Sequence, residues 1–295
     1  MNAAKTILIL MMVISVIVVS GCIGQGNGQN LGSGIAIRYD VSPSVIYEGG
    51  QVAVYMDVEN VDIAAVDAYV DIFNTGVFSY AGKDGRERCR RMYKEFLPGE
   101  IKSMRCVLDA PSDMAKQIVS TNVDYKALLN KQFSAPLSFD IIGQSIYLDQ
   151  KNAGTLSYGQ QSYSFSDPNI LVSVEFSKQP PFVLREGEKV LMYVKTRSIG
   201  PGFLKDIDKD NFQLELQNQA DNNVKLNCDF PGSGAEKLIA IKGEFPPITC
   251  ELNIAEVYSK LNGVEQKNYL RSFMLIIKYN YEYEIRGTIP LVVNK

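Results

Sequence analysis

Histidine is absent from this chain of 295 residues. Its absence removes the commonest general base, the commonest zinc ligand and every Ser–His or Cys–His catalytic pair. A hydrolase that acts through carboxylates alone is the form of catalysis left open. The sequence also has no strand–turn–helix nucleophile elbow, and its glycine-rich strings do not join a strand to a helix. We therefore expect a protein that is not an enzyme and that needs no cofactor.

An excess of charge of one sign is also missing. The chain has 30 Lys and Arg against 33 Asp and Glu, a formal net charge of −3. A nucleic-acid partner is not expected, because surfaces that bind nucleic acids are strongly basic. The hydrophobic share of 46% is typical of a folded globular protein, and the usage of Tyr, Val and Ile favours strands.

The sequence lacks an apolar run long enough to span a bilayer easily. The run Ile7 to Val19 falls short of the roughly 20 residues that a spanning helix needs, and it suits the apolar region of a signal peptide. Lys5 supplies the positive charge that precedes such a region. The run ends in Val19-Ser20-Gly21-Cys22, which resembles the lipobox of prokaryotic lipoproteins. The resemblance implies that residues 1–21 are removed and that Cys22 becomes the lipid-modified first residue.

The segment that follows is rich in Gly, Asn and Gln, so we expect residues 22–35 to form a flexible tether. The resemblance places the protein outside the cytoplasm, lipid-anchored to the outer face of the cytoplasmic membrane, or to the outer membrane where the organism has two. Its first partner is thus the membrane, through the lipid anchor. An uncleaved N-terminal helix with a chance cysteine is the alternative, and it gives the same compartment.

Two copies of one pattern follow the tether. The segment PSVIYEGGQVAVY begins at Pro43 and recurs without a gap as PFVLREGEKVLMY from Pro181, an offset of 138 residues. Near the ends of the copies, Val123, Tyr125, Pro136 and Leu137 match Ile277, Tyr279, Pro290 and Leu291 at an offset of 154. Order and spacing persist across the repeat, which predicts an internal duplication.

Each copy contains short stretches of alternating apolar and polar residues, separated by turn-forming residues such as Glu48-Gly49-Gly50. About seven short strands of this kind are typical of an immunoglobulin-like sandwich. We therefore predict an all-β chain with two tandem antiparallel immunoglobulin-like β-sandwiches. Their expected bounds are 36–142 and 168–295, and a partly flexible linker at 143–167 joins them.

Four cysteines remain besides Cys22, and none has the Cys-x-x-Cys spacing of a zinc site. An even set outside the cytoplasm indicates disulfides. Four cysteines permit three connectivities. The repeat places one pair in each copy, so we favour Cys89 with Cys106 and Cys228 with Cys250.

A family resemblance lies in the bends between strands. The first copy has Asn60 followed by Ala64-Ala65-Val66, and later Leu97-Pro98-Gly99-Glu100 leading into a strand. The second copy has Gly200-Pro201-Gly202 and Phe245-Pro246-Pro247. This arrangement is similar to the CARDB and NEW3 types of immunoglobulin-like domain, which recur in tandem on prokaryotic cell-surface proteins. The resemblance implies a surface lipoprotein, with an archaeal source expected, that serves adhesion or assembly; the cysteine pairs depart from the family pattern.

One motif has the residues of a cation site. Asp206, Asp208 and Asp210 form a D-x-D-x-D run, which could hold a weakly bound extracellular Ca²⁺. An EF-hand would need Gly and Glu where this chain has Asn211 and Gln217. A solvated turn is the alternative, and we favour it.

Two further patterns have a functional and a structural interpretation. The alternating tyrosines Tyr279, Tyr281 and Tyr283 could bind a glycan or peptide, but such a row more often faces a core. The basic stretch from Arg86 to Lys94 could contact an anionic partner, but charge on an exposed strand also blocks unwanted pairing. We favour the structural interpretation of both.

The expected function is that of a lipid-anchored, non-catalytic cell-surface protein for adhesion, scaffolding or assembly. Its contacts would use sandwich edges and loops, and its partner would be a protein or a cell-surface polymer. The alternative is an accessory ligand-binding subunit of a surface transport or secretion machine, which captures a peptide or glycan at the domain junction.

Overall fold

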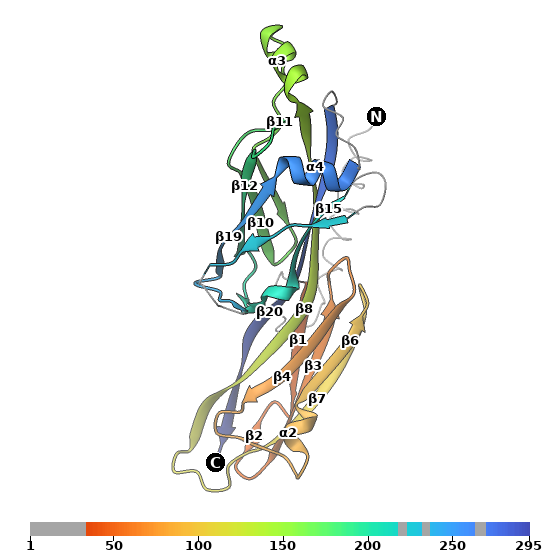
Figure 1. Ribbon diagram of the computed structural model, residues 1–295. Helices are drawn as coiled ribbons and strands as arrows, with labels where there is room; N and C mark the ends of the chain where they lie inside the picture. Colours follow the sequence, from red (N-terminus) through yellow and green to blue (C-terminus); the bar gives the residue numbers. More distant parts are fainter. Residues whose placement is uncertain (1–33, 218–222, 232–236, 263–269) are drawn as a thin grey trace, which may run out of the picture.

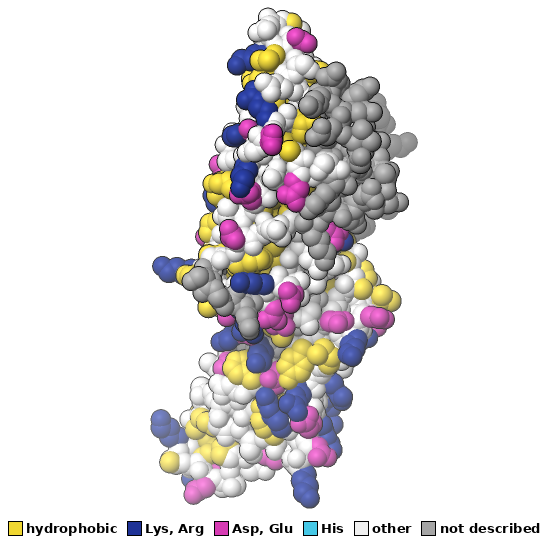
Figure 2. Space-filling view, in the orientation of Figure 1, with side chains coloured by type: hydrophobic (Ala, Val, Ile, Leu, Met, Phe, Trp, Pro, Cys, Tyr) yellow, Lys and Arg dark blue, Asp and Glu magenta, His cyan; other side chains and the backbone are white. Residues whose placement is uncertain are grey.

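The computed structural model describes residues 34–217, 223–231, 237–262 and 270–295. The leader, Cys22 and most of the expected tether lie outside the described residues. Within them the chain is predominantly β and its sheets are mostly antiparallel, as predicted. Figure 1 shows an elongated molecule with two lobes, which meet at a narrower waist, and Figure 2 shows charged side chains of both signs on the visible face of each lobe.

Each lobe has a sheet of its own. In the first lobe this sheet has the order β1-β3-β7-β5, with β1 at Ile35–Ser42, β3 at Gln51–Asn60, β5 at Ser79–Tyr80 and β7 at Ile101–Asp109. In the second lobe the order is β17-β19-β12-β10-β9, with β9 at Ser162–Ser166, β10 at Ile170–Phe176, β12 at Lys189–Ser198, β17 at Cys228–Asp229 and β19 at Glu244–Asn253.

A nine-stranded sheet is common to both lobes. Its main path has the order β16-β15-β20-β8-β4-β6, with β4 at Val66–Asn74, β6 at Arg90–Phe96, β8 at Ile118–Gly143, β15 at Phe212–Gln217, β16 at Asn223–Lys225 and β20 at Leu270–Asn294. Three short strands lie off this path: β2 at Ile46–Tyr47, β11 at Phe182–Leu184 and β13 at Phe203–Leu204.

The remaining elements are short. They are the strands β14 (Ile207–Asp208) and β18 (Lys237–Leu238), the 3₁₀ turn η1 (Lys209–Asn211), and the helices α2 (Gly85–Arg88), α3 (Gln144–Asn152) and α4 (Ile254–Asn262).

Strands β8 and β20 form an antiparallel ribbon that runs through both lobes (Figure 1). Their register extends from Ile118 opposite Asn294 to Ile142 opposite Leu270. β4 of the first lobe pairs with the beginning of β8, and β15 of the second lobe pairs with the beginning of β20. Each long strand therefore begins in one lobe and ends in the other.

The lobes are thus not successive stretches of the chain, unlike the expected units 36–142 and 168–295. The end of β20 lies in the first lobe, where Val293 pairs with Ile46 of β2. The physical reason is that β8 is too long for one sandwich, so its edge needs an equally long partner to satisfy its backbone groups. The expected linker at 143–167 also contains helix α3, and its strand β9 joins the second lobe by pairing with β10.

The core follows the two-residue period of the strands. In β3 the side chains of Val52, Val54, Met56 and Val58 are fully buried. One disulfide supports each lobe. Cys89 follows α2 beside the nine-stranded sheet and is bonded to Cys106 of β7, whereas Cys228 and Cys250 join the neighbouring strands β17 and β19. The cysteines thus pair within each copy of the sequence pattern.

Tyr125 packs on a glycine across the ribbon. It is fully buried and lies opposite Gly287, where an added Cβ would be 2.3 Å from the ring carbon Cζ of the tyrosine. Among the described residues, the buried hydroxyl of Tyr125 has no hydrogen-bond partner. Burial, with a smaller contribution from Tyr39, raises the pKa of Tyr125 from 10.0 to about 12. Folding therefore favours the neutral phenol.

This pKa predicts an alkaline loss of stability that Tyr125→Phe removes. Below pH 10 the phenol is neutral in both states, whereas between pH 10 and about 12 it ionises first in the unfolded chain, which lowers the free energy of unfolding. The decrease in the free energy of unfolding that is attributable to Tyr125 should reach about 2 kcal/mol. At pH 7 the variant should be at least as stable as the wild type, because it removes an unsatisfied hydroxyl.

Urea unfolding at several pH values measures this effect, and Tyr47→Phe is the control because Tyr47 is 61% exposed. If Tyr125→Phe and Tyr47→Phe show the same slope of stability against pH, burial of the Tyr125 phenol does not affect the alkaline transition.

Candidate functional site: a polar cavity at the waist

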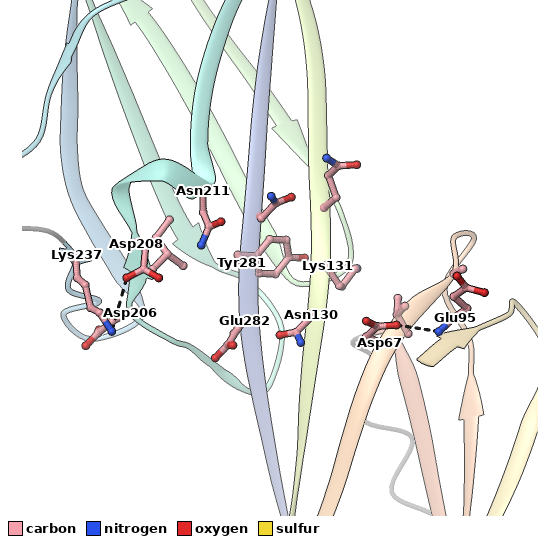
Figure 3. A pocket seen from close by; sticks show the side chains of 15 residues that line it. Asp67, Glu95, Asn130, Lys131, Asp206, Asp208, Asn211, Lys237, Tyr281 and Glu282 are labelled. Carbon is pink, nitrogen blue, oxygen red and sulfur yellow. Dashed lines mark hydrogen bonds and ion pairs between the residues drawn. The ribbon is translucent and has the colours of Figure 1, made fainter. Parts of the chain in front are cut away.

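An open cavity of about 650 Å³ lies at the waist, where both lobes and the ribbon contribute side chains (Figure 3). Its principal polar residues are Asp67 and Glu95 from the first lobe, Asn130 and Glu282 from the ribbon, and Asp208 and Lys237 from the second lobe. The cavity therefore exists only because the ribbon brings the two lobes together.

The floor of the cavity follows from the strand period. Asn130 lies opposite Glu282, and Gln132 lies opposite Asn280, on one face of the ribbon. Because successive side chains point to opposite faces, the residue between Asn130 and Gln132 is directed to the other face. That residue is Lys131, which lies opposite Tyr281 and is almost fully buried.

Lys131 is the centre of an ion-pair network that connects the lobes. Its Nζ lies 2.5 Å from Oδ2 of Asp62 and 3.5 Å from Oδ2 of Asp167. Asp62 follows β3 of the first lobe, and Asp167 lies between β9 and β10 of the second. The side chains of Lys131 and Asp62 are only 5% and 4% exposed. A buried charge is tolerated only when paired, so each lobe supplies an anion that the ribbon lysine requires.

Tyr281 extends this network. Its hydroxyl donates a hydrogen bond to Oδ2 of Asp167 and accepts one, at 3.3 Å, from Nδ2 of Asn169. Burial and the neighbouring carboxylate of Asp167 both raise the pKa of Tyr281, so the phenol stays protonated and acts as a donor. With Tyr283 also fully buried, the described members of the tyrosine row lie in the interior.

The loop that carries Asp62 is fixed by a buried asparagine. Nδ2 of Asn60 donates hydrogen bonds to the carbonyl oxygens of Ala64 and Phe96, and Oδ1 of Asn60 accepts one from the backbone N–H of Asp62. Asn60 and Ala64 belong to the sequence pattern that is similar to CARDB and NEW3 domains. In this structure they have a structural role. They hold the carboxylate that pairs with Lys131.

The carboxylates of the cavity are oriented by neighbouring groups. Asp67 accepts a hydrogen bond of 2.8 Å from the backbone N–H of Glu95, and Asp206 accepts one of 2.9 Å from that of Ala240. Oδ1 of Asp208 lies 3.7 Å from Nζ of Lys237 (Figure 3). Each carboxylate retains an oxygen that can accept a further hydrogen bond.

The proposed calcium ligands Asp206, Asp208 and Asp210 lie in an exposed segment around β14 and η1. Across the described residues, no group of three or more Cys, Asp or Glu side chains could hold a metal ion. The solvated turn that the sequence favours over a Ca²⁺ site stays a prediction.

A second cavity of about 470 Å³ adjoins the first and shares Asp206, Lys237 and Glu282 with it. It adds Glu284 and Arg286 from β20 and the exposed ring of Phe203 from β13.

Arg286 forms one wall of this second cavity. Its Nε and Nη2 both lie 2.6 Å from Oε1 of Glu284, and its guanidinium carbon is 5.9 Å from the ring centre of Phe203. Burial acts to raise the pKa of Glu284, but Arg286 and Lys205 outweigh it, so this pKa lies below its usual value. Glu284 therefore stays ionised and holds Arg286 in place.

The basic stretch from Arg86 to Lys94 lies at the edge of the nine-stranded sheet, because β6 is the last strand on that side. Arg86 is 2.9 Å from Asp71 and bonds to the hydroxyl of Tyr80 at 2.6 Å, and Arg90 pairs with Glu87. Several of these cations thus have partners within the lobe. Their place on an edge strand agrees with a role in blocking unwanted pairing.

The sequence patterns did not identify the waist network. One signal was available, because Lys131 occupies an inward position of β8 between Leu129 and Phe133, both of which are buried. A lysine in such a series requires a buried anion. Nothing in the strand pattern indicated that Asp62 and Asp167 would supply it.

Comparison with known proteins leaves the family open. No protein-family model matches the chain, and no curated protein matches it significantly. Among solved structures it is similar to "pT26-6p", at 8% identity over 85% of this chain and with a TM-score of 0.21. It spans 64% of the length of that protein. It is also similar to a collagen adhesin from S. aureus, at 10% identity over 90% of this chain and 94% of the other, with a TM-score of 0.14.

Neither similarity is close enough to carry an argument about function. Among the described residues, no helix is both long and apolar enough to cross a bilayer.

The waist network predicts that Lys131→Met is strongly destabilising. The substitution leaves Asp62 buried without its cation, so the free energy of unfolding should fall by about 3 to 5 kcal/mol. Arg38→Met is the matched control, because Arg38 pairs with Glu59 at the surface and is 63% exposed. In Arg38→Met the free energy of unfolding should fall by less than about 1 kcal/mol. Urea unfolding measures both; equal losses would show that the buried pair does not stabilise the waist.

Proposed function

We propose that this protein is a lipid-anchored, non-catalytic surface protein that acts in adhesion, scaffolding or assembly. The observation that carries the proposal is the β8–β20 ribbon, which makes one stiff, elongated body of the two lobes. The ribbon strand β20 has 25 residues, which at about 3.3 Å per residue corresponds to a rod of roughly 80 Å. Such a body suits the presentation of a contact surface to other molecules.

The proposal includes an internal duplication of an immunoglobulin-like unit. The first-lobe order β1-β3-β7-β5 has its counterpart in β10-β12-β19-β17 of the second lobe. At the sequence offset of 154, the counterpart of Leu129 is Tyr283, and these two residues are paired directly. This pair would lie on the approximate two-fold axis between the copies. Each copy then contributes part of its last strand, β8 or β20, to the lobe that the other copy mainly forms.

The place where the chain enters the rod indicates how a lipid would orient it. β1 begins at Ile35, which pairs with Asn60, and the carbonyl of Gly34 accepts a hydrogen bond from the N–H of Val61. Both contacts are at the waist, beside Asp62. A lipid on Cys22 would therefore tether the rod near its middle and leave both ends free for partners.

A second candidate function is ligand binding by an accessory subunit of a surface machine. The waist cavity supports it, because ligand sites commonly lie between domains and have volumes of about 300 to 1,000 Å³. The cavity is lined from both lobes and is within this range.

The lipid anchor predicts that Cys22→Ser releases the protein from membranes. Two acyl chains hold a protein stably, whereas the unmodified variant has neither. Cell fractionation should move the variant from the membrane fraction to the soluble fraction or the medium, and mass spectrometry should find a lipid on the wild-type N-terminal peptide only. Ser33→Ala, in the tether, is the control and should stay with the membrane. Retention of Cys22→Ser at the wild-type level would contradict the anchor.

A further inference from the structure

We propose that the waist cavity binds a segment of a neutral oligosaccharide, and that the surface polymer contacted by this protein is therefore a neutral glycan. The inference rests on the proposed surface function, and it names the chemical class of one partner. It is based on the residues that line the cavity, on their charges and on the pairing of the strands below them.

The cavity combines hydrogen-bond donors with acceptors. Four side-chain amides line it: Asn130, Gln132, Asn211 and Asn280. Each amide can donate and accept, whereas the carboxylates beside them only accept. A sugar hydroxyl also donates and accepts, so a chain of sugars can satisfy amides and carboxylates together. A ligand with acceptors alone would leave the carboxylates unpaired.

The charge of the cavity disfavours an anionic ligand. Five carboxylates line it, those of Asp67, Glu95, Asp206, Asp208 and Glu282. Two lysines border the cavity: Lys131 is directed to the other face and paired with Asp62, and Lys237 lies near Asp208. The remaining field is negative and repels phosphate groups and uronic acids. The ligand should therefore carry no anionic group.

The strands below the cavity disfavour an added peptide strand. At Asn130, β8 is paired with Glu282 of β20 on one side and with Asp67 of β4 on the other. The backbone at this point is thus engaged on both edges, whereas a peptide that extends a sheet requires a free edge. The apolar lining is small: Ala65, Val66 and Ile207, the last two of which are buried. An apolar peptide anchor has no pocket here.

The adjoining cavity favours a chain of sugars over a single sugar. It continues from Asp206 and Glu282 towards Phe203, a residue that is 57% exposed. Aromatic rings offer an apolar surface on which the C–H face of a sugar can pack. The polar floor at the waist and this ring together form one extended surface.

Calorimetry on the full-length protein in detergent tests the inference. The probes are a panel of neutral tetrasaccharides built from glucose, galactose, mannose or N-acetylglucosamine, a uronic-acid tetrasaccharide and a lysine-rich octapeptide. At least one neutral tetrasaccharide should bind, and the uronic-acid compound should not. The double variant E282Q/N211A should bind the same sugar at least tenfold more weakly, because it replaces a charged carboxylate with a neutral, weaker acceptor and removes one amide from the cavity.

Glu251→Gln is the matched control, because Glu251 is 46% exposed and pairs with Lys189 on another sheet. It should leave the affinity unchanged, and urea unfolding should show that both variants are folded. Failure of the whole neutral panel to bind overturns the inference, as does binding of the octapeptide that is lost in E282Q/N211A. If Cys22-dependent membrane retention persists in that case, the surface function stands and only the ligand class is wrong.

Discussion

The continuous hydrogen-bonded ladder between β8 and β20 is the constraint on which the rest of the structure depends. A long strand presents a long row of N–H and C=O groups, and these must be paired along its length. Among the described strands, β8 finds such a partner only in β20, so β20 must run back through both lobes. The lobes cannot then be separated without breaking the ladder.

The waist follows from this arrangement. The ladder places Lys131 and Tyr281 opposite each other on the inner face, where Asp62 and Asp167 approach from the two lobes. The same strands place Asn130 and the neighbouring polar side chains on the outer face, where they form the floor of the cavity. One pair of strands thus produces both the network that joins the lobes and the surface proposed to bind a ligand.

Much of the local structure could be predicted from the sequence, because alternation and turn residues depend on near neighbours. The strand class follows from such signals, and the cysteine pairs follow from the repeated sequence pattern. The partner of β8 could not be predicted, since a two-residue period identifies the buried face of a strand but not the strand beside it. Lys131 illustrates this limit: its inward position indicated a buried anion, but Asp62 and Asp167 meet it only after the ribbon has formed.

The ribbon makes one cooperative unit of the two lobes, and native-state hydrogen exchange at increasing urea can measure this cooperativity segment by segment. Peptides from 124–130 and 283–289 report on the first-lobe part of the ribbon, and peptides from 134–142 and 270–278 report on the second-lobe part. All four segments should exchange through the same global opening, with equal free energies and equal dependence on urea. Exchange of one pair of segments at a clearly lower free energy, with the other pair still protected, would contradict it.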